Sequence, residues 1–364
     1  MRTIALCALV FLLTLAARAE EAAAVIKDDL YVGQPLVVDN VTVWAVYSKR
    51  EMPKLGDFVT LEEAQKNEKA VVRERRAEAA PVANQEAAQQ VRQSGGDAAT
   101  VNELVIENKG EQAILVLAGT LVKGGKQDRQ IAQDFIIPAG KTVGVDAFCV
   151  ERGRWQGTRE GTDTKGVFEV QKSLTASGVR YTGQNKADQG EVWRKVAEEN
   201  GKAGKAPSTG TYQAVVEETD KDAVARREKL AKAIEEKFAE LEKKGERPLG
   251  VAYAVDGKVR EIRSFAQPEI YQRYRPILVN TIAIEGDLAQ RQALAKKEEI
   301  YNKAARAEKI PELVKKLETV KEEQQQTKAG NVIRFQRDAS ASKNDCYVDP
   351  KSKSPVTSTW AAAE

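Results

Sequence analysis

Histidine is absent from the 364-residue sequence. Histidine supplies the general base of most hydrolase triads and dyads, and it is the commonest protein ligand of metals. A Ser-His-Asp triad, a Cys-His dyad and a histidine-based zinc site are therefore excluded within this chain. Its three cysteines are too few for a zinc site made of thiolates alone. We expect no metal and no cofactor, and any chemistry must use carboxylates, arginine, lysine, tyrosine or a thiol.

A strong charge of one sign is also missing. The chain has 57 basic and 54 acidic side chains, which gives a formal net charge of +3. A balance so close to neutrality provides no field for binding nucleic acid or a membrane surface, so we expect no nucleic-acid partner. Charged residues make up 30% of the chain, above the usual quarter, and this predicts a long solvated stretch beside a packed part.

Long hydrophobic runs are limited to the start of the chain. The run from Ile4 to Ala17 has about 14 residues, short of the roughly 20 that cross a bilayer. Arg2 precedes this run, and Ala17, Arg18 and Ala19 supply the small-x-small pattern of a signal peptidase site. The sequence therefore predicts a cleaved signal peptide at residues 1–19, a periplasmic or secreted protein, and no membrane span after cleavage.

Cysteine is scarce, and Cys7 lies within the predicted signal peptide. Export would place Cys149 and Cys346 in an oxidising compartment, so we expect them to form a disulfide. Closing so long a loop could stabilise the fold by roughly 5 kcal/mol on the chain-entropy model. The alternative is a nucleophilic Cys149 thiolate whose pKa is lowered by Arg152 and Arg154.

The apolar residues are densest at 101–155, where short aliphatic runs are separated by turn signals. This pattern predicts an antiparallel β core, either sandwich-like or a partly closed sheet. Residues 36–48 also have strand composition. Asp256 and Gly257, within 251–262, are the strongest hairpin signal in the chain.

Helical periodicity of apolar side chains predicts helices at 189–199 and 223–244. Thr60, followed three residues later by Glu63, forms the capping-box pattern that opens a helix. The predicted fold class is therefore α+β, with an antiparallel β core, packed helices and a charged helical insertion near the C-terminus.

Composition divides the chain into segments. We expect a signal peptide at 1–19, an N-terminal lead at 20–35, an α+β domain at 36–286, a charged helical segment at 287–330, and a returning strand with a tail at 331–364. Residues 77–100 lack large apolar side chains, which predicts a low-complexity excursion from the domain. The charged segment is interpreted as two helices broken near Ile310 and Pro311 that pack on the body. A protein partner bound through these charged helices is the alternative.

Residues 119–127 superficially resemble a phosphate-binding P-loop. The spacing is one residue too long, and Gln127 stands where the motif needs a serine or threonine. The following residues have strand composition, so no helix N-terminus is available to receive a phosphate. A P-loop NTPase is excluded.

Polar side chains cluster at the ends of two predicted strands. Lys126, Gln127 and Arg129 follow the first, and the second ends in Cys149, Glu151, Arg152, Arg154 and Trp155. Arginine binds carboxylate or phosphate in a bidentate manner, glutamine reads amides or hydroxyls, and tryptophan offers a stacking face. The set predicts a site for a small anionic, ring-bearing ligand. The alternative is that the charged residues form ion pairs across the strand ends while the tryptophan covers the core.

Two elements within this set are the most specific in the chain: Lys-Gln-x-Arg at 126–129 and Cys-x-Glu-x-Gly-Arg-Trp at 149–155. On these elements the sequence resembles the ARG and rhodanese-phosphatase-superfamily-associated protein domain family, over about residues 36–284. The resemblance implies one α+β domain and a genomic association with ADP-ribosylglycohydrolases and rhodanese-type phosphatases. It suggests an ADP-ribose-like or other nucleotide-derived ligand and carries no established reaction. The residues that match its motifs are Lys126, Gln127, Arg129, Cys149, Glu151, Arg154 and Trp155.

Three classes of function remain open. The leading hypothesis is an exported domain that binds a small anionic ligand, either ADP-ribose-like, nucleotide-derived or a sugar phosphate. The second is a metal-independent hydrolase in which Glu151 acts as acid or base. The third is a structural or interaction protein of the cell envelope that uses the charged helices.

Overall fold

The structure is a computed structural model that describes residues 23–75, 103–159, 161–298, 304–326, 332–339 and 342–362. The predicted signal peptide at 1–19 and the predicted excursion at 77–100 lie outside the described residues. Within the described ranges, no helix is long and apolar enough to cross a membrane.

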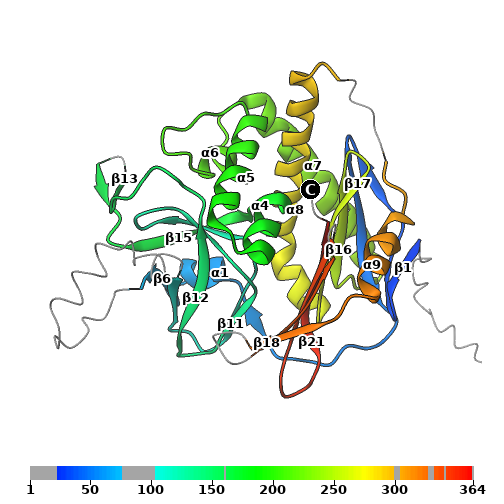
Figure 1. The fold of residues 1–364 in the computed structure, drawn as a ribbon. Helices are drawn as coiled ribbons and strands as arrows, with labels where there is room; N and C mark the ends of the chain where they lie inside the picture. The colour runs from blue at the N-terminus through cyan, green and yellow to red at the C-terminus, as the bar shows by residue number, and fades with distance from the viewer. Residues whose placement is uncertain are drawn as a thin grey trace, which may run out of the picture.

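The first of two large β structures is a curled antiparallel sheet, which we call the large sheet (Figure 1). Its strands follow the order β1-β2-β4-β16-β17-β21-β20-β19-β18, and β3 pairs with β4. The strands are β1 (Ala24–Lys27), β2 (Leu30–Val32), β3 (Leu36–Val38), β4 (Val41–Ser48), β16 (Gly250–Val255), β17 (Lys258–Phe265), β18 (Glu323–Gln326), β19 (Ile333–Ala339), β20 (Ser342–Val348) and β21 (Pro355–Ala362).

The second β structure is a closed barrel with the strand order β10-β12-β7-β6-β15-β9. Its strands are β6 (Ala70–Glu74), β7 (Glu103–Asn108), β9 (Thr120–Gly124), β10 (Arg129–Ile131), β12 (Thr142–Cys149) and β15 (Val167–Leu174). Apolar side chains such as Val72, Ile106, Val122 and Phe168 form its core. A three-stranded sheet of β5 (Phe58–Val59), β8 (Ala113–Val116) and β11 (Phe135–Ile137) lies beside it, and β13 (Thr158–Arg159) pairs with β14 (Thr162–Asp163).

Helices fill the space between the two β structures and cover the large sheet. They are α1 (Leu61–Lys66), α4 (Ser177–Tyr181), the π-helix η1 (Thr182–Lys186), α5 (Gln189–Lys202), α6 (Gln213–Val216), α7 (Lys221–Lys243), α8 (Pro268–Ala295) and α9 (Lys309–Glu318). Helix α8 contacts both the barrel strand β15 and the sheet strands β16 and β17 (Figure 1). Helix α9 packs on the opposite face of the large sheet, where Ile310 and Leu313 join the core around Trp44. The α+β class predicted from the sequence is confirmed.

Local signals in the sequence placed several elements correctly. Thr60 and Glu63 form the reciprocal capping box at the start of α1. The hairpin of β16 and β17 turns at Asp256 and Gly257, whose φ angles of 51° and 75° suit the tight turn. Helices α5 and α7 agree with the predicted helices to within a few residues.

The C-terminal third differs from the prediction. Helix α8 runs without a break through residue 287, because its side chains are buried on most sides between barrel and sheet. Two helices with a boundary near Ile310 and Pro311 are confirmed, since α9 begins at Lys309 and Pro311 lies in its first turn, where its missing N–H costs no hydrogen bond. The extent of the helices differs from the prediction, because α8 ends at Ala295, residues 304–308 are not helical, and 323–326 form β18. Residues 333–362 supply three paired strands of the large sheet instead of one strand and a polar tail.

Candidate functional site

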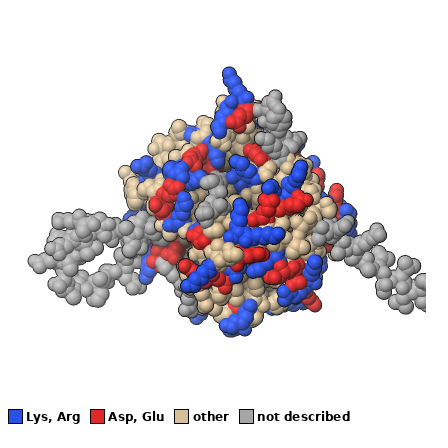
Figure 2. All heavy atoms as spheres, turned by 45° about the vertical axis from the view of Figure 1, so that its right-hand side comes forward, with Lys and Arg blue, Asp and Glu red and all other residues tan. Residues whose placement is uncertain are grey.

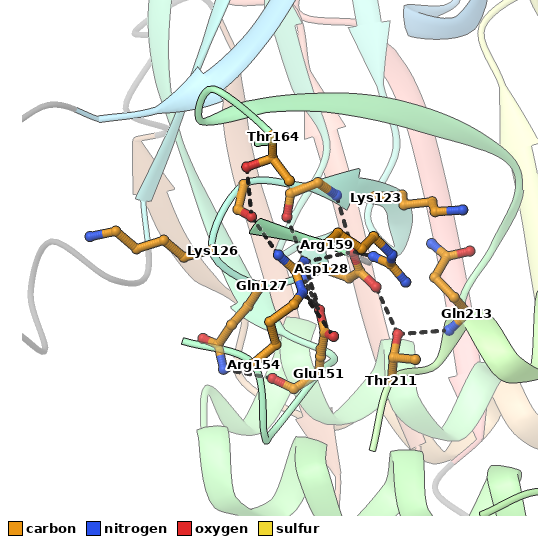
Figure 3. Close-up of polar contacts among 12 residues, drawn as sticks. Lys123, Lys126, Gln127, Asp128, Glu151, Arg154, Arg159, Thr164, Thr211 and Gln213 are labelled. Atoms are coloured by element: carbon orange, nitrogen blue, oxygen red, sulfur yellow. Dashed lines mark hydrogen bonds and ion pairs between the residues drawn. The ribbon is translucent and has the colours of Figure 1, made fainter. Parts of the chain in front are cut away.

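The two motif segments meet at one end of the barrel. Strand β10 pairs with β12 so that Arg129 lies opposite Cys149, and β10 also pairs with β9. The turn at 125–128 therefore faces the segment at 150–156 (Figure 3). This pairing, which a local sequence pattern does not specify, brings together side chains about twenty residues apart in the chain.

Asp128 is the centre of a buried polar cluster. Its side chain is 0% exposed. One carboxylate oxygen accepts hydrogen bonds from the N–H of Gly124 at 3.0 Å and from Arg159 at 2.6 Å. The other accepts from the Thr211 hydroxyl at 2.7 Å. Asp128 thus joins the 125–128 turn to two segments that follow much later in the chain.

Glu151 and Arg154 complete this cluster, which we call the barrel-end network: Asp128, Glu151, Arg154, Arg159 and Thr211. Arg154 donates to Glu151 from Nε at 3.0 Å and from Nη2 at 2.8 Å. The same guanidinium donates to the carbonyl oxygens of Gly124 at 2.9 Å and Gly125 at 2.6 Å. Glu151 also accepts the N–H of Asp128 at 3.0 Å. The pair therefore fixes the backbone of the opposite turn.

The two carboxylates of the network differ in their affinity for protons. Burial raises the pKa of Asp128, and the charge of Glu151 raises it further, against the hydrogen bonds from Thr211 and Arg159. Burial acts on Glu151 in the same direction, but hydrogen bonds from Arg154 and from the N–H of Asp128 outweigh it and lower the pKa of Glu151. Glu151 is therefore the carboxylate that stays ionised, and Asp128 takes up a proton first as the pH falls.

Arg129 is buried without a carboxylate partner. Its side chain is 4% exposed. Nη1 donates to Gln127 Oε1 at 3.0 Å and contacts the sulfur of Cys149. Across the described part of the chain, no carboxylate lies within ion-pair distance of Arg129, and its Nε has no hydrogen-bond partner. Burial raises the pKa of the Cys149 thiol, so the thiol is neutral near pH 7 and does not balance the charge.

Burial also lowers the pKa of the Arg129 guanidinium, against the attraction of the more distant carboxylates of Glu74 and Asp128. Arginine nevertheless stays protonated in proteins. Gln127 holds the guanidinium from one side, because its Nε2 donates to the carbonyl oxygen of Glu151 at 2.7 Å. The barrel end therefore presents a positioned cation without a direct counter-charge.

Gln213 is a further unsatisfied group beside the network. It is 1% exposed, and neither atom of its side-chain amide has a hydrogen-bond partner among the described residues. Its backbone N–H donates to Thr211 at 3.1 Å. Sequence reasoning missed Asp128, Arg159, Thr211 and Gln213. Asp128 is the unspecified position of the Lys-Gln-x-Arg element, so the motif could have indicated it. No local sequence pattern indicates Arg159, Thr211 or Gln213.

The structure separates the predicted site residues into two groups. Gln127, Arg129, Cys149, Glu151 and Arg154 converge at the barrel end, and Lys126, Arg152 and Trp155 remain outside. Lys126 is exposed, and Trp155 is 54% exposed, so it does not cover the core. Arg152 lies against helix α5, with its guanidinium carbon 5.8 Å from the ring centroid of Trp193.

A cleft of about 510 Å³ opens beside Arg152, and we call it the α5 cleft. One wall is the face of α5 that carries Trp193, Ala197 and Asn200, and the other is the loop at 205–210. Its lining consists of Arg152, Gly153, Trp193, Ala197, Asn200 and residues 205–210. The cleft thus lies on the α5 side of the same segment whose Glu151 and Arg154 contact Asp128.

The predicted disulfide is wrong. Cys149 ends strand β12 of the barrel, Cys346 lies in β20 of the large sheet, and both are free thiols. Cys149 contacts Arg129, whereas the sulfur of Cys346 lies 3.2 Å from the hydroxyl of Ser358. The prediction rested on the number of thiols and the expected compartment, neither of which specifies where two strands lie in space.

On the face shown in Figure 2, basic and acidic side chains are interspersed, and neither sign forms an extended patch.

Comparison with known protein families identifies the family of the chain. The family model for the ARG and Rhodanese-Phosphatase-superfamily-associated Protein domain matches residues 29–353. This confirms the resemblance seen in the motifs and extends it beyond 284, so that α9, β19 and β20 fall within the matched range. No curated protein and no solved structure matches the chain significantly.

Proposed function

The chain belongs to the family of ARG and rhodanese-phosphatase-superfamily-associated protein domains, and we propose that it binds a small anionic ligand at the end of its barrel, through Arg129. Gln127 positions the guanidinium, and the barrel-end network positions Gln127. No metal takes part in this proposal.

The unpaired charge of Arg129 is the observation that carries the proposal. Burying a cation without a counter-charge costs several kcal/mol, so buried arginines are normally paired. A ligand carboxylate or phosphate would supply the missing charge, and its oxygens fit the fork of the guanidinium. Nε is buried and lacks a partner among the described residues, so an anion bound at this guanidinium would supply the missing acceptor.

The family resemblance narrows the ligand to phosphate-bearing molecules of the ADP-ribose, nucleotide or sugar-phosphate kind. The barrel end itself selects only for a small anion. We therefore treat phosphate as the recognised group and the rest of the ligand as the part to be identified by experiment.

Binding is better supported than hydrolysis through Glu151. A general acid needs a raised pKa, whereas the pKa of Glu151 is lowered by Arg154 and by the N–H of Asp128 in spite of burial. Acting as a base would require breaking its bonds to Arg154. Glu151 is therefore a positioning residue in this proposal.

Thermal unfolding in the presence of ligands tests the proposal. Inorganic phosphate, ADP-ribose and glucose 6-phosphate would each be added at millimolar concentration, with ribose as the uncharged comparator. Binding to the native state raises the melting temperature, so we expect a rise with at least one phosphate compound and none with ribose. The absence of a rise with all three phosphate compounds would overturn the proposal.

Two variants test whether the rise in melting temperature comes from binding at Arg129. Arg129→Met removes the charge and keeps an apolar side chain of similar length, so the rise should disappear. Arg273→Met is the control, because Arg273 is a half-exposed surface residue whose ion pair with Glu63 is 3.4 Å long. A rise that survives in the Arg129 variant would place binding elsewhere and contradict the assignment.

A further inference from the structure

We propose that the α5 cleft is a second binding site, separate from Arg129, for a small carboxylate that carries an amide group. N-acylated amino acids are the simplest molecules of this class. The residues of this cleft are distinct from those of the barrel-end site.

The walls of the cleft are fixed by local structure. Trp193, Ala197 and Asn200 lie at i, i+4 and i+7 of α5, which places them on one face of the helix. The opposite loop is tied to the barrel segment by the N–H of Gly153, which donates to the carbonyl oxygen of Thr209 at 2.7 Å. The volume of about 510 Å³ lies within the range of small-molecule sites, roughly 300–1,000 Å³.

The helix wall contains one unpaired acceptor and one unpaired donor. Asn200 is 4% exposed, and its Nδ2 donates to the carbonyl oxygen of Thr211 at 3.2 Å. Its Oδ1 and the Nε1–H of Trp193 are buried and have no hydrogen-bond partner in the part of the chain that the structure describes. Buried polar groups are nearly always paired, so these two call for a ligand or water. An amide offers an N–H to the first and a carbonyl oxygen to the second.

Arg152 supplies the charge that recognises the carboxylate. It is exposed, and it makes no ion pair with any described residue. Lys205, the other cation of the lining, is already held by Glu218 at 2.9 Å. Because Arg152 lies over the indole of Trp193, a ligand side chain that stacks on this face of the ring displaces the guanidinium toward the ligand carboxylate. The exposed ring then offers an apolar face to the ligand side chain.

The cleft and the barrel end can be tested independently. The backbone between them is shared, since Gln127 donates to the carbonyl oxygen of Glu151. Their side chains are distinct, with Arg152, Trp193 and Asn200 at the cleft and Arg129 with Gln127 at the barrel end.

Isothermal titration with N-acetyl-L-phenylalanine is the test. Two comparators each lack one recognised group: N-acetyl-L-phenylalanine amide has no carboxylate, and 3-phenylpropanoate has no amide. We expect millimolar binding of the probe and binding of each comparator weaker by roughly tenfold, about 1.4 kcal/mol. No heat from the probe, or equal affinity for probe and comparators, would overturn the proposal.

Substitutions in and around the α5 cleft test which residues contact the probe. Arg152→Met and Trp193→Phe should each weaken probe binding by roughly tenfold, the latter because it keeps a ring and removes only the N–H donor. Arg194→Ala is the matched control on α5, since Arg194 is exposed and bound to Glu191 and Glu198, and it should bind like the wild type. Arg129→Met should also leave probe binding unchanged. A loss of probe binding in Arg129→Met, or wild-type binding in Arg152→Met, contradicts a separate cleft site.

Discussion

Arg154 and Glu151, three residues apart, form a buried ion pair with an Nη2 to Oε2 distance of 2.8 Å. The same arginine donates to the carbonyl oxygens of Gly124 and Gly125, and the same glutamate accepts the N–H of Asp128. The pair therefore acts as a clamp on the turn that precedes Arg129. Arg154 and Glu151 were both predicted at the ligand site. In the structure they contact the turn that precedes Arg129, which is the residue that we propose binds the ligand.

Arg154→Met should destabilise the protein by about 3–5 kcal/mol, because it leaves the Glu151 carboxylate buried and unpaired. Arg152→Met, two residues earlier, should change the free energy of unfolding by about 0–1 kcal/mol, since Arg152 is exposed. Urea unfolding at pH 7 measures both. Equal stability of the two variants would show that the pair of Arg154 and Glu151 contributes nothing to the free energy of unfolding.

The Glu151→Gln variant should lose less free energy of unfolding than the wild type as the pH falls. The pKa of Glu151 is lowered in the folded state, so its contribution is present above about pH 4.3, the unfolded value, and is lost as the pH falls through the folded pKa. Asp128 acts in the opposite sense, because its pKa is raised and protonation relieves its buried charge. Because the charge of Glu151 also raises the pKa of Asp128, the comparison of the wild type with this variant reports the ionised Glu151 together with its effect on Asp128.

Urea unfolding between pH 7 and about pH 3.5 gives the comparison. The variant should be less stable than the wild type at pH 7, and the difference should shrink toward acid. A constant difference across this range would mean that the ionised form of Glu151 does not matter for stability.

Both thiols should be free and react slowly in the native protein. Cys149 is 1% exposed, whereas Cys346 is half-buried and lines a cavity of about 440 Å³. Burial raises the pKa of each thiol, which reduces the reactive thiolate. Iodoacetamide labelling followed by mass spectrometry should find Cys346 modified first and Cys149 only after unfolding. A cross-linked peptide containing both would contradict the structure.

Gly124→Ala should lower the free energy of unfolding more than Gly140→Ala, although both glycines have positive φ. A methyl group at Gly124 would lie 2.2 Å from the carbonyl oxygen of Val167, whereas one at Gly140 meets nothing within 4 Å. The first should lose more than about 3 kcal/mol, and the second roughly 1–2 kcal/mol from backbone strain alone. Thermal unfolding of the two variants makes the comparison, and equal melting temperatures would contradict the close approach of the strands.

Signals confined to one element were readable in the sequence. The capping box of Thr60 and Glu63 and the turn at Asp256 and Gly257 depend only on neighbouring residues. The site predicted at the two motif segments agrees with the structure only in part: Gln127, Arg129, Cys149, Glu151 and Arg154 converge, whereas Lys126, Arg152 and Trp155 remain outside.

Contacts between residues of different strands and helices could not be predicted from the sequence. Asp128 finds Arg159 and Thr211 through the tertiary fold, and the unpaired state of Arg129 depends on which carboxylates do not reach it. Strand β20 has the sequence SKNDCYV, and its polar side chains are buried, as in the pair of Asp345 with Arg334 at 2.6 Å. Without an apolar alternation, such a strand has the composition of a tail.

The most direct test of the central claim is a phosphate titration at constant ionic strength that follows the melting temperatures of the wild type and Arg129→Met. The account predicts that the wild type gains stability with the logarithm of phosphate concentration, and that the variant does not respond. Without phosphate, the variant should be at least as stable as the wild type, because an unpaired buried charge has been removed. Parallel rises in both proteins, or no rise in the wild type, would contradict anion binding by Arg129.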